Sequence, residues 1–145
     1  MRKIALLLLL ILLVFSIASC GVSQKFDVTD VAMEVIEESV TPLGLTVCVS
    51  NNTKIDIYGG IADDFLIEKL ENDKWSPLEE TRDRTNNTET YIFQGNRELN
   101  IYWSEIYGSL APGTYRISKC FYTYPVDTTH SSNEGFILTA EFIIE

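Results

Sequence analysis

Apolar and polar residues alternate along most of the chain from residue 31 onward. The clearest case is GLTVCVSNN, residues 44–52, which places Leu45, Val47 and Val49 on one face and mainly polar side chains on the other. A period of two with β-branched residues is typical of a half-buried β-strand. Similar patterns predict further strands at residues 31–38, 55–58, 65–70, 75–78, 98–103, 114–124 and 136–145.

Turn residues separate these segments. Residues 71–74, ENDK, predict the tip of a hairpin, and Pro77 in the returning strand favours a sheet edge because proline donates no ladder hydrogen bond. Residues 79–87 and 125–135 are polar and predict surface loops, and residues 104–110 predict one helical turn. We find no long amphipathic helix, so the pattern predicts an all-β antiparallel sandwich or barrel.

The first residues follow a different pattern. Arg2 and Lys3 precede an unbroken apolar run over residues 4–15, which is followed by small residues. A run of about 12 apolar residues is too short for a membrane span, which needs roughly 20, and is typical of a signal peptide. We therefore expect residues 1–19 to be a cleaved signal peptide.

The order Ile17-Ala18-Ser19-Cys20 resembles the lipobox of bacterial lipoproteins. The resemblance implies cleavage between Ser19 and Cys20 and a diacylglyceryl group on the Cys20 thiol. Two acyl chains suffice for stable anchoring in a bilayer. We expect residues 20–29 to form a lipidated tether, with residues 30–145 as one domain on the extracytoplasmic face of the cell membrane.

The charge of the chain narrows the partners. Its 21 acidic and 11 basic residues give a net charge of −10, which becomes −12 once the signal peptide removes Arg2 and Lys3. Nucleic-acid binding needs clustered lysine and arginine, so this acidic body argues against it. Removing 19 of the 145 residues leaves 126, enough for one domain with a real core.

The segment GSLAPGTYRI, residues 108–117, identifies the fold most closely. A tyrosine that follows a Pro-Gly turn at the start of a strand is typical of the tyrosine corner of immunoglobulin-like sandwiches. Together with the strands above, it resembles the bacterial Ig-like domain, a family common in small lipoproteins and surface proteins of Gram-positive bacteria. The resemblance implies an immunoglobulin-like antiparallel β-sandwich. The residues that carry it are Trp75, Trp103, Tyr107, Gly108, Leu110, Pro112, Gly113, Tyr115 and Arg116.

The two remaining cysteines are an even pair in an exported chain, which invites a disulfide. In the implied sandwich, however, Cys48 shares its face with Thr46 and Ser50, and Cys120 shares its face with Ser118. Both thiols would then point outward on different sheets, and only a bulge that shifts one register would let them meet. We expect them to remain unbridged.

Residues of catalytic type are few. His130 is the single histidine and lies in a polar loop, where a solvated side chain is the simpler interpretation; a Cys120–His130 pair stays open because the two flank one hairpin. The acidic pairs 63–64 and 79–80 could offer oxygen ligands to calcium, which needs six to eight. We expect solvated charge there, no metal, no cofactor and no enzyme.

Polar motifs and exposed aromatics have equally plain interpretations. Residues 51–53 and 86–88 fit the glycosylation sequon, but we expect their asparagines to serve turns. Tyr102 and Tyr122 should point outward, where tyrosines can bind protein or glycan. We favour cross-strand pairing for them.

The function that follows is a membrane-anchored, non-catalytic binding or accessory module. Its partner would be an envelope protein or a glycan, bound through loops 79–87 and 125–135 or through a strand edge. The alternative is an inhibitor that offers one of these loops to an envelope protease or wall hydrolase. An enzyme would require His130 or Cys120.

Overall fold

The computed structural model describes residues 28–60, 64–81, 90–123 and 135–145. This part of the chain forms β-strands and two short 3-10 helices, η1 and η2. The elements are η1 (Val28–Asp30), β1 (Val31–Val35), η2 (Glu37–Ser39), β2 (Gly44–Asn51), β3 (Ile57–Gly60), β4 (Phe65–Glu71), β5 (Lys74–Pro77), β6 (Thr90–Phe93), β7 (Gly95–Tyr102), β8 (Gly113–Tyr122) and β9 (Gly135–Ile144).

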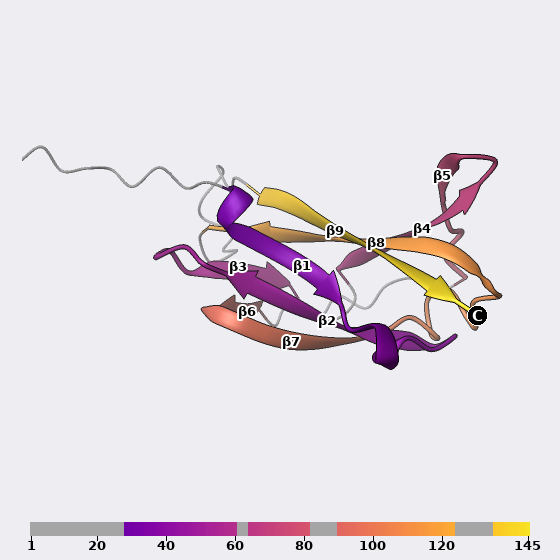
Figure 1. Ribbon diagram of the computed structural model, residues 1–145, viewed down its shortest axis with the longest axis horizontal. Helices are drawn as coiled ribbons and strands as arrows, with labels where there is room; N and C mark the ends of the chain where they lie inside the picture. Colours follow the sequence, from indigo (N-terminus) through magenta and orange to yellow (C-terminus); the bar gives the residue numbers. More distant parts are fainter. Residues whose placement is uncertain (1–27, 61–63, 82–89, 124–134) are drawn as a thin grey trace, which may run out of the picture.

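These strands form two antiparallel sheets that pack face to face (Figure 1). The smaller sheet has the order β1-β2-β7. In the larger sheet, β8 pairs with β9 along its whole length, and on its other side it pairs with β4 and then with β3. β5 extends the larger sheet beyond β4, and β6 extends it beyond β3. The predicted antiparallel β-sandwich is confirmed.

The core lies between the sheets and contains the residues that the alternation placed inward. Leu45, Val47 and Val49 of β2 are buried, and Val49 faces its cross-strand partner Met33 of β1. From the opposite sheet, Ile117 of β8 is buried with Ile67 of β4, to which it is paired. Burying apolar side chains of this size contributes roughly 1.5–3 kcal/mol each, which makes the core the main source of stability.

Three local predictions are also confirmed. The β4–β5 hairpin turns through Asn72 and Asp73, whose φ angles of 50° and 61° are those of a tight two-residue turn. The Tyr115 hydroxyl donates a hydrogen bond of 2.7 Å to the carbonyl of Ala111, which is the expected tyrosine corner. Residues 104–107 form the predicted helical turn, with the Gly108 amide donating to the Ser104 carbonyl.

Three local features differ from the expected pattern or were not predicted. The first strand ends at Val35 rather than at residue 38, because the glutamates that follow enter η2. Residues 28 and 29, predicted as part of the tether, belong to η1. Lys119, at an inward position of β8, is only 1% exposed, and its Nζ donates to the backbone carbonyl of Asp64 at 3.1 Å.

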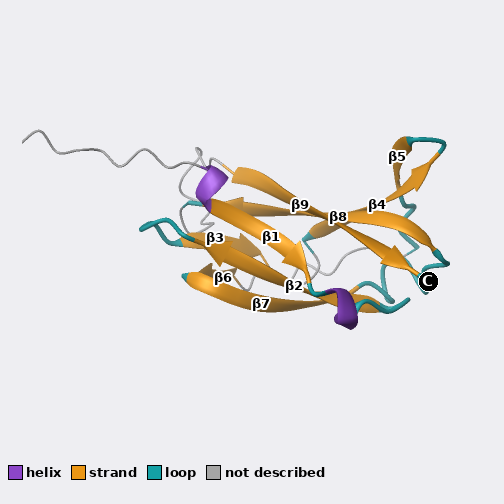
Figure 2. Ribbon diagram, in the orientation of Figure 1, coloured by secondary structure: helices purple, strands orange, loops and turns teal. Residues whose placement is uncertain are grey.

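The two ends of the sandwich differ in what they carry. β1 and β9 both run away from η1, and Figure 2 shows η1 and η2 at opposite ends of β1. We call the end with η1 the N-terminal end. The other end, which carries η2, the tip of the β4–β5 hairpin, residues 103–112 and the last residues of β9, is called the far end.

Candidate functional site

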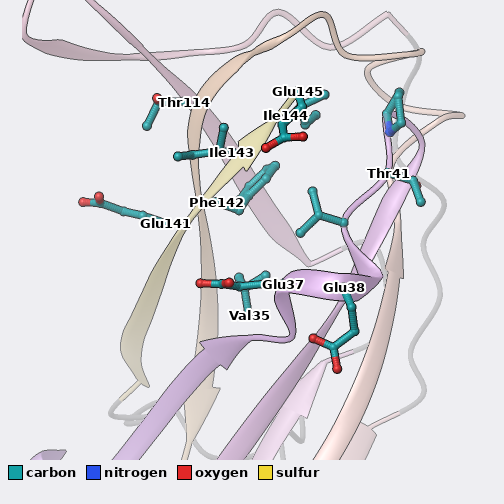
Figure 3. A pocket seen from close by; sticks show the side chains of 12 residues that line it. Val35, Glu37, Glu38, Thr41, Thr114, Glu141, Phe142, Ile143, Ile144 and Glu145 are labelled. Carbon is teal, nitrogen blue, oxygen red and sulfur yellow. The ribbon is translucent and has the colours of Figure 1, made fainter.

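A groove of about 660 Å³ opens at the far end, between η2 and the last residues of β9 (Figure 3). Its existence follows from the unequal lengths of two neighbouring strands. β1 approaches β9 but ends at Val35, whereas β9 continues past Phe142 to Ile144. Beyond Val35 the chain turns through η2, and the space beside β9 is left open.

The η2 wall of the groove is held by short hydrogen bonds. The Ser39 hydroxyl donates to the Ile36 carbonyl at 2.6 Å and accepts from the Thr46 amide at 2.7 Å. The Thr41 hydroxyl donates to the Gly44 carbonyl at 2.9 Å and accepts from the Gly44 amide. These bonds fix the wall to the first residues of β2, so the groove is shaped before any ligand arrives.

Phe142 forms the floor of the groove and is the central ring of an aromatic stack. Phe142 lies between Trp103, with ring centroids 5.4 Å apart, and Tyr115, with centroids 5.5 Å apart, and both pairs are close to parallel. The indole N–H of Trp103 donates to the Pro42 carbonyl at 2.8 Å, which joins the floor to the η2 wall. In Figure 3 the Phe142 side chain points into the space facing η2. The floor is therefore apolar and rigid.

The rim is acidic. Four exposed glutamates line the groove: Glu37, Glu38, Glu141 and Glu145. The remaining lining residues are apolar or uncharged, and no lysine, arginine or histidine is among them. An acidic rim around an apolar floor favours a ligand that combines positive charge with apolar groups.

Two of the predicted signature residues, Trp103 and Tyr115, stack on Phe142 beneath this groove. Tyr107 and Leu110 are also buried, and Tyr107 packs against Phe65. Gly108 has a φ of +73°, a left-handed conformation that favours glycine. The bend at Pro112-Gly113 then leads into β8.

Trp75 is an exception among the signature residues. It lies on the outer surface of the larger sheet, half-buried, with the guanidinium of Arg116 4.8 Å from its ring centre. Glu68 also bonds that guanidinium, and this hydrogen bond raises the pKa of Arg116. Trp75 therefore supports a surface cluster and not the core between the sheets.

The predicted lipidation and cleavage residues, Ser19 and Cys20, lie outside the described residues, as do His130 and most of loops 79–87 and 125–135. These predictions remain untested. Within the described ranges, no helix is long and apolar enough to cross a membrane. In the same ranges, no three or more histidine, cysteine, aspartate or glutamate side chains lie so that they could hold a metal ion together.

Cys48 and Cys120 are free thiols on different sheets, as the alternation predicted. The side chain of Cys120 hydrogen-bonds Tyr122, and this bond, together with partial burial, raises the pKa of Tyr122 to about 12. Tyr122 is also the cross-strand partner of Tyr58. This agrees with the pairing role that we favoured for it.

The asparagine at position 51 serves a turn, as predicted. Its side chain is 3% exposed and donates to the carbonyls of Ile55 and Phe93, both at 2.9 Å. It also accepts from the amide and the hydroxyl of Thr53. An amide enclosed in this way is a structural hub and not a glycan acceptor.

The groove itself was missed by sequence reasoning, which pointed to loops 79–87 and 125–135 or to an unspecified strand edge. A signal was present in the charged residues 37–38, which interrupt the alternation of the first strand. Their position opposite Phe142, about a hundred residues later, required the fold. The burial of Lys119 could also have been expected from the sequence, because this residue occupies an inward position of its strand.

Comparison with known proteins agrees with this architecture. The sequence profile of a family described as the bacterial Ig-like domain matches residues 27–141, which is most of the chain. No curated protein and no solved structure gave a match. In the structure, the sheet β1-β2-β7 faces the sheet built on β9, β8 and β4, the arrangement of an immunoglobulin sandwich.

Proposed function

This chain belongs to the bacterial Ig-like domain family, and on that premise we propose that it is a lipid-anchored, non-catalytic binding module of the cell envelope. Cys20 carries the anchor after removal of residues 1–19, and the sandwich acts by contact with an envelope protein. Ig-like sandwiches serve mainly as binding scaffolds, although a fold alone does not determine a function.

The observation that carries this proposal is the position of the groove at the far end. A tether of seven residues between Cys20 and η1 reaches at most about 25 Å from the membrane. The ten residues of β9 then place the groove roughly 30 Å beyond the N-terminal end. A module anchored at Cys20 would thus present the groove to the envelope and not to its own membrane.

The loop at residues 125–135 would have the opposite placement. The described residues that flank it, Thr123 and Gly135, lie at the N-terminal end, close to the proposed anchor. This geometry favours the groove over that loop as the contact site. It also weakens the proposal of a protease or hydrolase inhibitor that acts through the loop.

Site-specific photocrosslinking on intact cells tests the proposal. A photoreactive residue replaces Glu38 at the groove rim, and in a matched control it replaces Glu98, an exposed glutamate on β7 outside the groove. We expect one envelope protein to crosslink from position 38 and not from position 98. Identical products from both positions, or no product from either, would contradict a binding role for the far end.

A further inference from the structure

We propose that the groove takes an extended peptide that adds a strand to β9, with apolar and basic residues in alternation. This inference rests on the proposed binding function and specifies its ligand. Three features of the far end support this proposal: the unpaired edge of β9, the apolar groove beside that edge, and the acidic rim of the groove.

The edge of β9 supplies the backbone partners. Among the described strands, β9 hydrogen-bonds only with β8, so its other edge is unpaired. β1 covers the first part of this edge from the smaller sheet, but it ends at Val35. From Glu141 to Ile144, every second residue therefore offers an N–H and a C=O to an incoming strand.

The apolar groove determines which positions of the peptide must be apolar. In a strand added beside β9, alternate side chains point the same way as Phe142 and Ile144. They would enter the groove between these two residues and the half-buried Val35 and Val40 on the other wall. Those positions of the peptide must be apolar, and the volume of about 660 Å³ accommodates aliphatic side chains.

The rim sets the charge of the other positions. Side chains of opposite parity would lie beside Glu141 and the exposed Ile143, with Glu37 and Glu145 nearby. Arg116 is the cross-strand partner of Glu141 and attracts it, but the hydrogen-bonded ion pair of Arg116 is with Glu68. Glu141 is exposed and lines the groove, so its carboxylate can also meet a basic side chain at the open edge. Lysine or arginine at these positions would form cross-strand pairs with the rim.

The test uses the full-length protein in detergent and a fluorescent peptide in which valine or isoleucine alternates with lysine. We expect saturable binding, measured by fluorescence anisotropy. Two N-methylated versions of the same peptide then probe the backbone. Methyl groups on residues of one parity should weaken binding more than about tenfold, because they remove the bonds to β9, while the other parity should bind normally. Equal binding of both would overturn strand addition.

Charge reversal locates the peptide. The double variant Glu37→Lys with Glu141→Lys should bind about tenfold more weakly, since each exposed charge pair changes a binding constant by a factor of roughly 1.5–5 and reversal adds repulsion. The matched control is Glu34→Lys with Glu98→Lys, two exposed glutamates of the smaller sheet that do not line the groove. Equal weakening by both double variants would reveal only general charge attraction and would overturn the site.

The experiments can disprove the binding function and the strand addition independently of each other. If photocrosslinking from position 38 captures an envelope protein but the alternating peptide shows no saturable binding, strand addition is wrong and the binding function stands. If the peptide binds with the expected parity and charge dependence but nothing is captured on cells, the groove has the inferred chemistry and the proposed function is wrong.

Discussion

Replacement of Asn51 by alanine should destabilise the sandwich more than any surface substitution nearby. The amide closes the N-terminal end by donating to the carbonyls of Ile55 and Phe93, and it accepts two bonds from Thr53. These bonds join the last residue of β2 to Ile55, just before β3, and to Phe93, the last residue of β6. Alanine would therefore loosen the contact between the two sheets at this end.

The magnitude follows from the burial of each partner. The bond to the Phe93 carbonyl is buried, and an acceptor left there without a donor costs about 1–3 kcal/mol. The bonds to Ile55 and Thr53 are part-buried and can be replaced by water, so together they add about 1 kcal/mol. The free energy of unfolding should fall by about 2–4 kcal/mol, a large share of the 5–15 kcal/mol typical of such domains.

Urea unfolding followed by circular dichroism measures this loss, with Asn52→Ala as the matched control. Asn52 is exposed, and its replacement should change the free energy of unfolding by less than about 0.5 kcal/mol. At about 3–5 °C per kcal/mol, Asn51→Ala should also lower Tm by roughly 10 °C. A loss below about 1 kcal/mol for Asn51→Ala would refute the role of this hub.

Three further outcomes are expected. Cys20→Ala should release the protein from the membrane fraction, and intact mass spectrometry should find no acyl groups; an unchanged distribution would contradict the anchor. Cys120→Ala should lower the pKa of Tyr122 from about 12 toward 10, measured by ¹³C NMR of the phenol, because the raised pKa depends first on the Cys120 hydrogen bond. Stability that Tyr122 contributes below pH 10 in the wild type should be lost between about pH 10 and 12, and this loss should be smaller in the variant, where the folded pKa lies closer to 10. Tyr115→Phe should reduce the free energy of unfolding by about 0.5–1.5 kcal/mol, because it removes one hydrogen bond to an exposed residue, Ala111; no measurable loss would show that the corner is not stabilising.

The faces of the strands were predictable because alternation is a local property. The inward set of β2, from Leu45 to Val49, needed only the period of two, and the corner at Tyr115 needed only its neighbouring turn. The same rule placed Lys119 inward. It could not say that a lysine would be tolerated there, because that depends on the Asp64 carbonyl, which β4 brings close.

The groove was not predictable for a different reason. It depends on where β1 ends relative to β9, and these strands are about a hundred residues apart and do not pair with each other. Local pattern marked the end of β1 through Glu37 and Glu38, but only the packed sheets bring Phe142 opposite that point. Loops 79–87 and 125–135 were predicted as binding sites because binding residues are commonly found on loops.

The division between signature and groove residues explains why the family alone does not identify a ligand. Trp103 and Tyr115 are part of the fold signature, and their rings also support the groove floor from below. Changes there should damage fold and groove together. Glu37 and Glu141 lie outside the signature and contribute only exposed charge at the rim. The fold can therefore keep its floor while the rim changes freely, so ligand preference in such a domain should follow the residues on η2 and the end of β9.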